Sequence, residues 1–348
     1  MVSMNKQINA VAKKMRFSIE NIQIFIVSTL LLCTLVACDK FADSPYPAIE
    51  FKLQAKMPDN GRSSAVGFAI NGKGYVALGK AQPNSNYLKD CWEFSPDSDK
   101  WTQKADFPGV ARVKAMAAVV NGKAYVGLGY AEGAFYQSPN LYLQDFWMFD
   151  PAKNTWIQKK DFPGTGTDAC VSFVYNDEIY LGSGYSGWGN TQYEFWKYSL
   201  VNDAWTKLAD FTGSPRFGAV ACTNGKRIFF GAGFKTYNTN DWWEYFPQSD
   251  SWKQVEAMPD GRVNAIALSV NDRFFVATGR FFQGNLTGGH VKSDITEYDA
   301  DRNVWYNRGN IPNGNRENAI SFVINGTAYI GFGENDQTVL NDLWSFKP

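Results

Sequence analysis

Histidine is almost absent from this 348-residue sequence, and its scarcity excludes several kinds of functional site. The single histidine is His290. Most catalytic zinc centres and all multi-histidine copper centres need more than one imidazole, so this chain cannot build them. General acid or base chemistry at His290 alone remains open. We therefore expect no metal and no other cofactor.

The sequence also lacks an excess of charge of either sign, because 34 basic residues balance 34 acidic ones. Nucleic-acid binding normally requires a basic face, so we expect no nucleic-acid partner. Hydrophobic residues make up 45% of the chain and aromatic residues 16%, which is enough to bury a substantial core. The composition is therefore that of a folded protein and not of a disordered one.

Cysteines are few and follow no metal-binding or disulfide pattern. Cys91, Cys170 and Cys222 lie in strand-like segments, and Cys33 and Cys38 lie near the N-terminus. The first three form no C-x-x-C motif and have no neighbouring histidine, so they indicate neither a disulfide framework nor a metal site. We expect them to be buried free thiols.

A long apolar segment at residues 22–36 follows a cluster of basic residues, Lys13, Lys14 and Arg16. It is short for a membrane span and is typical of the apolar region of a signal peptide. It ends in Leu35-Val36-Ala37-Cys38, which resembles the lipobox of bacterial lipoproteins. The resemblance implies cleavage before Cys38 and acylation of that cysteine. The alternative is an ordinary secretory signal with a chance cysteine.

These features predict a signal peptide over residues 1–37 and a lipidated tether over residues 38–48, with Met15 as an alternative start. Several acyl chains on Cys38 would anchor the protein stably. The predicted location is a bacterial cell envelope, with the lipid-anchored protein on the periplasmic or the surface face of the outer membrane.

A tight turn recurs six times in the rest of the chain, at intervals of 47 to 55 residues. The turns are Asn71-Gly72, Asn121-Gly122, Asn176-Asp177, Asn224-Gly225, Asn271-Asp272 and Asn325-Gly326. Such pairs tolerate the positive φ of type I′ turns, so each turn predicts a hairpin between two apolar strands. The second strand of each hairpin ends in glycine, at Gly79, Gly129, Gly184, Gly233, Gly279 and Gly333. An internal repeat of this period indicates a propeller, a solenoid or a similar array.

Each repeat continues with an acidic residue and an aromatic strand, and five repeats then have a further tryptophan. The acidic residues are Asp90, Asp145, Glu194, Asp241, Asp294 and Asp342, and the tryptophans are Trp101, Trp156, Trp205, Trp252 and Trp305. Four strands per unit of about 50 residues, with these glycines and tryptophans, resemble kelch repeats. The resemblance covers residues 49–348 and implies an all-β, six-bladed β-propeller with four antiparallel strands per blade.

The sixth repeat stops at Pro348, where its last strand should begin. Residues 51–58 align with residues 101–108, which contain the last strand of the first repeat. We therefore predict that an N-terminal strand closes the last blade and removes an open sheet edge. Because the tryptophans repeat, we interpret them as packing between blades and not as sugar-binding residues.

An arginine begins the first strand of five repeats, whereas the third repeat has Thr167-Asp168 at this place. The arginines are Arg62, Arg112, Arg216, Arg262 and Arg316. In a four-stranded blade this end of the strand lies on the face of the long loops between strands two and three, so we place any site at the channel mouth there. Lys114 follows Arg112 by two residues and is expected on the same side of the strand. Such guanidiniums bind carboxylates or phosphates; the alternative is that each pairs with the acidic residue of its blade.

Loop aromatics that do not repeat form a second candidate set, with Tyr136, Trp188 and Phe282 as its main members. Packing symmetry does not require these residues, so they are candidates for stacking on sugar rings or for gripping a protein segment. Phe282 lies near His290 in the sequence. The alternative is that each loop packs on its own aromatic residue.

Together these features favour a binding module that recognises a glycan or an envelope protein through its channel-mouth face. The ligand-binding candidates are Arg62, Arg112, Lys114, Tyr136, Asp168, Trp188, Arg216, Arg262, Phe282, His290 and Arg316. A further resemblance, to kelch mutarotases and epimerases of N-acetylneuraminate, implies an alternative function with His290, Asp168 and Glu317 as acid/base candidates. The kelch propeller of galactose oxidase needs two histidines for its copper, so that activity is not expected here.

Overall fold

The computed structural model describes residues 41–348, apart from residues 60, 83–85, 133–140, 188 and 285. Residues 43–348 form one unit. The predicted signal peptide, Cys38, Tyr136 and Trp188 lie outside the described residues, so those assignments stay predictions. In the part of the chain that is described, no helix is long and apolar enough to cross a membrane.

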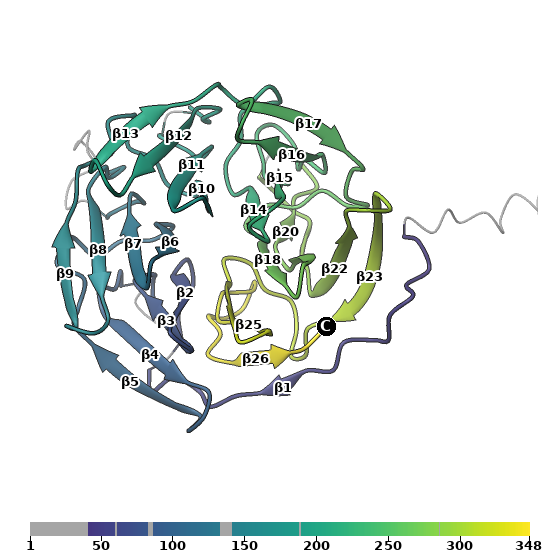
Figure 1. Ribbon diagram of the computed structural model, residues 1–348. Coiled ribbons are helices and arrows are strands. Elements are labelled where there is room, and N and C mark those ends of the chain that lie inside the picture. The colour runs from purple at the N-terminus through teal and green to yellow at the C-terminus, as the bar shows by residue number, and fades with distance from the viewer. Residues whose placement is uncertain (1–40, 60, 83–85, 133–140, 188, 285) are drawn as a thin grey trace, which may run out of the picture. The chain divides into compact units, whose positions relative to one another are not determined.

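All regular elements of the described residues are β-strands, and 24 of them form six four-stranded antiparallel sheets around a central channel (Figure 1). Blade one has β2 (Val66–Ile70), β3 (Lys73–Ala77), β4 (Cys91–Ser95) and β5 (Lys100–Lys104). Blade two has β6 (Met116–Val120), β7 (Lys123–Gly127), β8 (Phe146–Asp150) and β9 (Thr155–Gln158). Blade three has β10 (Val171–Tyr175), β11 (Glu178–Gly182), β12 (Phe195–Ser199) and β13 (Ala204–Lys207).

The second half of the ring repeats this arrangement. Blade four has β14 (Val220–Thr223), β15 (Ile228–Gly231), β16 (Trp242–Phe246) and β17 (Ser251–Val255). Blade five has β18 (Ile266–Val270), β19 (Arg273–Ala277), β22 (Asp294–Asp299) and β23 (Val304–Asn310). A two-stranded hairpin, β20 (Arg280–Phe281) and β21 (His290–Val291), lies between β19 and β22. Blade six has β24 (Ile320–Ile324), β25 (Thr327–Gly331), β26 (Leu343–Phe346) and, from the N-terminal end, β1 (Lys52–Leu53).

The predicted all-β, six-bladed propeller is therefore confirmed, and so is its closure. In blade six Lys52 lies opposite Ser345 and Leu53 opposite Trp344. The backbone N–H of Gln54 also donates to the carbonyl of Leu343 at 2.8 Å. Strand β1 thus covers the edge that β26 would otherwise expose.

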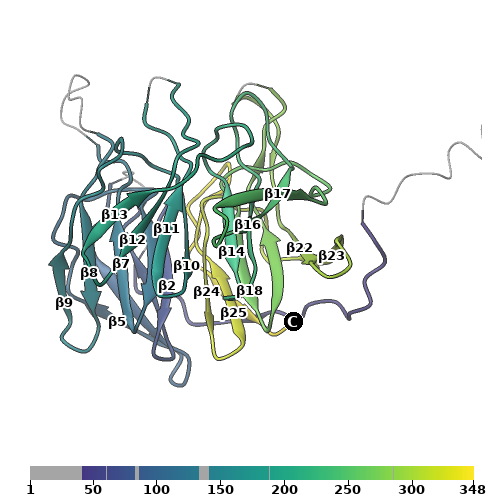
Figure 2. The ribbon, with the colours of Figure 1, turned by 45° about the horizontal axis from the view of Figure 1, so that its top comes forward.

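The recurring turns form the tight hairpins that the sequence predicts. Asn71 and Gly72, for example, have φ values of 50° and 76°, as a type I′ turn requires. Blade four differs, because the side-chain oxygen of Asn224 accepts hydrogen bonds from the backbone of Lys226 and Arg227. These turns lie on one face of the ring, the turn face, and the loops between second and third strands lie on the other, the mouth face (Figure 2).

The repeated tryptophans pack between blades, as predicted. Trp156 of blade two donates its indole N–H to the carbonyl of Ala105, which follows the outer strand of blade one, at 2.9 Å. Its ring lies 5.1 Å from that of Phe107. Trp101, Trp205 and Trp305 make the same kind of bond to the preceding blade. The three cysteines among the described residues are free thiols; Cys91 and Cys222 are buried, while Cys170 is partly exposed and lines the channel.

Candidate ligand-binding site at the channel mouth

Six residues at the starts of the innermost strands form a closed ring of backbone hydrogen bonds, here called the throat ring. Each N–H donates to the carbonyl of its counterpart in the preceding blade, at 2.9–3.1 Å. All six have φ between 48° and 60°. The members are Ser64, Lys114, Ala169, Gly218, Asn264 and Asn318. Because the start of every innermost strand is hydrogen-bonded to its counterparts in the two neighbouring blades, the throat ring fixes the relative positions of the blades beneath the mouth loops.

The throat ring corrects one expectation about Lys114. Strict alternation along the strand would put its side chain on the same side as that of Arg112. The positive φ of 53° at Lys114 breaks this alternation. Lys114 therefore lines the channel at the level of the throat ring, whereas Arg112 is fully buried.

The five repeated arginines are buried in ion pairs, not displayed at the mouth. Arg316 binds Asp342 through two hydrogen bonds of 2.8 and 2.9 Å, and its third contact is with the carbonyl of Phe332. The indole of Trp344 donates to the same carboxylate. Burial alone would raise the pKa of Asp342, but the hydrogen bonds and charge of Arg316 outweigh it and lower that pKa.

The other four blades with an arginine repeat this pairing, and each of the five side chains is 0–1% exposed. The pairs are Arg62–Asp90, Arg112–Asp145, Arg216–Asp241, Arg262–Asp294 and Arg316–Asp342. Their guanidiniums are thus already occupied by carboxylates. The interpretation of these five arginines as a ligand-binding ring is corrected, and the pairing alternative holds.

Blade three, which lacks the arginine, has an unpaired carboxylate in its place. Glu194 forms an ion pair with Lys207 of the outer strand, with 2.7 Å between Oε1 and Nζ. The hydroxyl of Thr167 donates to the carbonyl of Tyr185. Asp168 is only 8% exposed, and its buried Oδ1 has no hydrogen-bond partner among the described residues. Burial raises the pKa of Asp168 to about 6, although the charge of Lys114 opposes the shift. An unsatisfied buried carboxylate costs stability, which makes Asp168 a functional candidate.

Seven aromatic rings curve around the mouth from blade one to blade five, and we call them the aromatic arc. Consecutive ring centroids are 5.3–6.3 Å apart. In order, they are Tyr87, Tyr130, Tyr142, Tyr185, Phe217, Phe234 and Phe282. The four tyrosines are partly exposed. Burial, and next the charge of Asp168, raise the pKa of Tyr142, so its hydroxyl remains a protonated donor at neutral pH.

Charged side chains occupy the rest of the mouth, across blades five, six and one. Arg280 binds Glu317 at 2.5 Å and also contacts Asp336, while Lys80 binds Glu334 at 2.9 Å. Glu317 stands in blade six at the position that Asp168 holds in blade three. The mouth is thus polarised, with satisfied charges on one side and aromatic rings around an unpaired carboxylate on the other.

Most of the aromatic arc was not predicted, although the sequence contains a signal for it. The residue after the glycine that ends each second strand faces the mouth at an isolated β-bridge. Along the chain these residues are Lys80, Tyr130, Tyr185, Phe234, Arg280 and Glu334. Aromatic residues in three consecutive blades and charged residues in the other three, all at one repeat position, predict a mouth with one aromatic side and one charged side.

The structure separates the remaining predicted site residues. Phe282 ends the aromatic arc and is tied to the loop of blade four by two hydrogen bonds between its backbone and the side chain of Asn238. His290 is exposed on β21, with its ring 5.7 Å from that of Phe281. Blade four lies between it and Asp168, so these two proposed acid/base groups do not share a blade or a blade interface.

Small side chains line the channel below the mouth, so the channel offers a ligand little to bind. A cavity of about 120 Å³ lies at the throat ring, and one of about 240 Å³ lies beneath it. Ala65, Gly67, Ala117 and Ser172 are typical of the lining. The mouth, not the channel, therefore holds the groups that could recognise a ligand.

Comparisons with known proteins agree with the architecture. The chain is 25% identical over 272 residues to "Kelch-like protein 23" of Homo sapiens and, equally, to that of Pongo abelii. The alignment covers 78% of this chain and 46% of each relative. The chain is a kelch-type propeller. It spans about half the length of these curated relatives.

A solved structure described as "Structure of YjhT" shares this kelch-type fold. The two superpose with a TM-score of 0.70 at 19% sequence identity, over 83% of this chain and 96% of that one. No family model matches the kelch propeller described here.

Proposed function

We propose that this kelch propeller is a lipid-anchored binding module of a bacterial cell envelope, and that it recognises a glycan at the aromatic side of its channel mouth. The observation that carries the proposal is the aromatic arc around the unpaired Asp168. The lipobox-like sequence ending in Cys38 supports the location.

The chemistry of this side of the mouth suits a sugar. The apolar faces of pyranose rings pack on aromatic rings, and partly exposed tyrosines supply such surfaces at low entropic cost. The carboxyl group of Asp168 can accept a hydroxyl hydrogen, while Lys114 and the Tyr142 hydroxyl can donate. The throat ring holds these groups in place before a ligand arrives, which reduces the ordering cost of binding.

Glycan binding is favoured over docking of an envelope protein because the features are concentrated on one side of the channel mouth. A stable protein interface buries about 800 Å² on each partner and has an apolar centre. Here the aromatic rings surround a buried carboxylate, and the opposite side carries charges that are already paired. A protein partner is the competing outcome of the test below.

The test is glycan-array screening of the purified protein, followed by calorimetry with the best oligosaccharide. Tyr142→Ala is expected to weaken binding about tenfold or more, because it removes one of the four partly exposed tyrosine rings of the arc. Tyr142→Phe separates ring stacking from the hydroxyl bond. The matched control is Tyr175→Ala, since Tyr175 lies at the hairpin turn of blade three on the turn face. Equal losses for both alanine variants, or no glycan signal with capture of an envelope protein, would refute the proposal.

A second candidate function, sugar mutarotation, is supported by Asp168 alone. A carboxyl with a pKa of about 6 can exchange a proton with an anomeric hydroxyl near neutral pH. Anomer exchange measured by NMR saturation transfer would detect it. Loss of an observed rate in Asp168→Asn, with glycan binding retained, would favour catalysis over simple binding.

A further inference from the structure

The segment before β1 is held on blade five by a cluster of charged residues. The guanidinium carbon of Arg273 lies 3.8 Å from the ring centroid of Tyr46, and that of Arg308 lies 5.3 Å from it. Arg308 also donates to the carbonyl of Pro47 at 2.7 Å. The ring of Tyr306 meets Tyr46 edge-on at 6.3 Å. Tyr46 is thus held by two cations and an aromatic edge, although it is 38% exposed.

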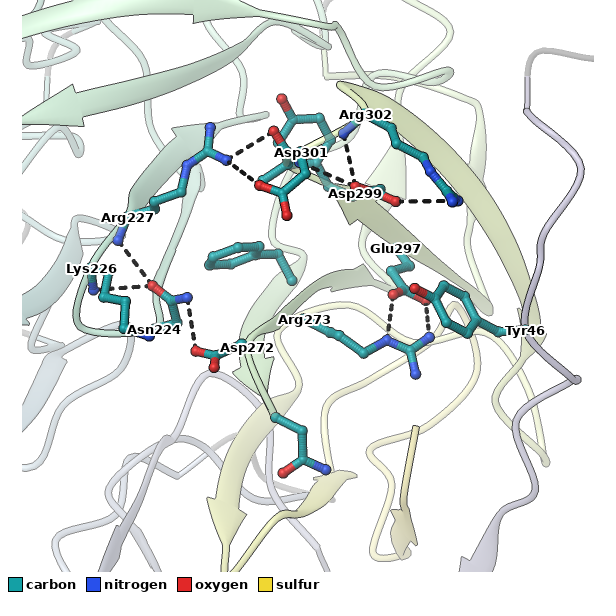
Figure 3. Close-up of a pocket in the computed structure, with 14 residues that line it drawn as sticks. Tyr46, Asn224, Lys226, Arg227, Asp272, Arg273, Glu297, Asp299, Asp301 and Arg302 are labelled. Atoms are coloured by element: carbon teal, nitrogen blue, oxygen red, sulfur yellow. Dashed lines mark hydrogen bonds and ion pairs between the residues drawn. The ribbon is translucent and has the colours of Figure 1, made fainter.

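Glu297 fixes both arginines in this geometry. It binds Nε and Nη2 of Arg273 at 2.5 Å each, and it also contacts Arg308. Glu297 and Arg308 are buried, so the triad is part of the blade and not a surface ion pair. Figure 3 shows Arg273 bound to Glu297 with the ring of Tyr46 beside them.

This arrangement repeats only in part among blades one to four. The pair Arg273–Glu297 has a counterpart in blade four, Arg227–Glu244, and blade one has the pair Lys104–Glu93, but the arginine at position 308 has no counterpart. Arg308 stands three residues after the outer-strand tryptophan of its blade. The residues at that place in blades one to four are Lys104, Lys159, Leu208 and Val255. Blade packing alone therefore does not require an arginine at this position, which points to a role specific to blade five.

Arg273, Glu297 and Arg308, together with the Tyr46 ring that they hold, are here called the clamp, which lies on the turn face, away from the mouth. Tyr46 lines a hollow of about 570 Å³ together with the hairpin turns of blades four and five (Figure 3). Beyond the clamp, Ile49 and Phe51 pack against the core between blades five and six, and Phe51 lies 5.4 Å from Phe346. The chain then enters β1 and closes the ring.

We propose that Arg273, Glu297 and Arg308 form a docking site for the chain's own tether, with Tyr46 as its anchor. The site fixes the side on which the tether joins the propeller. A lipid on Cys38, eight residues before Tyr46 and so within roughly 28 Å of chain, then keeps the turn face toward the membrane. The mouth faces away from the lipid, whatever ligand it binds.

Distance measurements by pulsed electron paramagnetic resonance test the clamp. Spin labels are placed at Asp43→Cys and at Asp301→Cys on the turn face, in a protein that carries Cys170→Ser because Cys170 is partly exposed. The native Cys91 and Cys222 are buried, with pKa values raised by burial, and react poorly. We expect a narrow distance distribution that Tyr46→Ala broadens and Tyr46→Phe preserves, because the ring makes the contact. Equal widths in the unaltered tether and in Tyr46→Ala would overturn the proposal.

A second measurement tests the orientation on a membrane. The lipidated protein is bound to liposomes that carry a headgroup quencher, with a fluorophore at Asp301→Cys or at Lys235→Cys on the mouth face. We expect stronger quenching at position 301 than at 235, with the difference reduced by Tyr46→Ala. Equal or inverted quenching would refute the orientation. Failure to bind liposomes would refute the lipid anchor, and the distance measurement would still decide the clamp; neither result bears on glycan binding.

Discussion

Arg316 and Asp342 form a two-bond ion pair in the interior of blade six, with the arginine fully buried. The pair joins the start of the innermost strand to the start of the third strand, and the same pair recurs in four other blades. It therefore sets the position of the mouth residues from beneath. Removing one partner leaves a charge without its counterion.

Arg316→Met is accordingly expected to lower the free energy of unfolding by about 3–5 kcal/mol. Urea denaturation of the purified protein measures this change. Arg302→Met is the control, because the Arg302 side chain is 63% exposed and its ion pair with Asp299 is long, at 3.8 Å. That variant should change stability by less than about 1 kcal/mol. Similar losses in both variants would contradict a structural role for the buried pair.

Asp168 is expected to destabilise the fold at neutral pH. Its folded-state pKa of about 6 exceeds the ordinary value of 3.8, so the native state binds more protons than the unfolded state between about pH 4 and pH 6. Stability therefore falls as pH rises through that window. Asp168→Asn should raise the free energy of unfolding by about 3 kcal/mol at pH 7.5, and by less than about 1 kcal/mol at pH 4.

Urea titrations at the two pH values check this prediction. The comparison variant is Glu317→Gln, since Glu317 holds the equivalent position but binds Arg280 and Asn264. It should lose stability at pH 7.5, opposite in sign to Asp168→Asn. The same sign for both would show that Asp168 has a partner in solution.

Glycan affinity should depend on pH through the same carboxyl group. Sugar hydroxyls donate to the ionised form of Asp168, so binding should weaken as pH falls through about 6. Affinity at pH 5 should be about tenfold lower than at pH 7.5, because about a tenth of the group is then ionised. Calorimetry at the two pH values measures the ratio. A pH response that persists in Asp168→Asn would assign it to another group.

Closure of the ring by the N-terminal segment makes Phe51 a stabilising residue. Its ring packs on Phe346 and on the core between blades five and six. Phe51→Ala should cost about 2–3 kcal/mol, whereas Leu53→Ala, at a side chain that is 46% exposed, should cost less than about 1 kcal/mol. Thermal unfolding followed by circular dichroism compares the two. Equal shifts would mean that β1 contributes only its backbone bonds.

The repeat made the fold predictable, because each local signal occurs several times at one period. Asn71-Gly72 and its counterparts located the hairpins, and the match of residues 51–58 to 101–108 located the closing strand. Both partners of the Arg62–Asp90 pair are recognisable in the sequence, but the sequence does not distinguish pairing from ligand binding. That choice depends on burial, and burial depends on how two strands of one blade pack.

The site was less predictable because its members come from several different positions of the repeat. Tyr87 and Tyr142 reach the aromatic arc from loops, while Tyr130 and Tyr185 follow second strands. The contact between Arg273 and Tyr46 in the clamp could not be predicted from the sequence either, because it joins residues more than 220 positions apart. The break at Thr167-Asp168 was visible, and it marks the unpaired carboxylate.

The throat ring has a mechanical consequence. A closed circle of six hydrogen bonds has no free end, so one blade cannot tilt or slide without straining the bonds on both of its sides. A displacement at Ala169 is therefore shared with Lys114 and Gly218, and through them with the whole circle. The mouth loops therefore extend from one stiff structure, made of the six blades and the throat ring. Differences in what such propellers recognise can arise from substitutions in these loops while the blades stay the same.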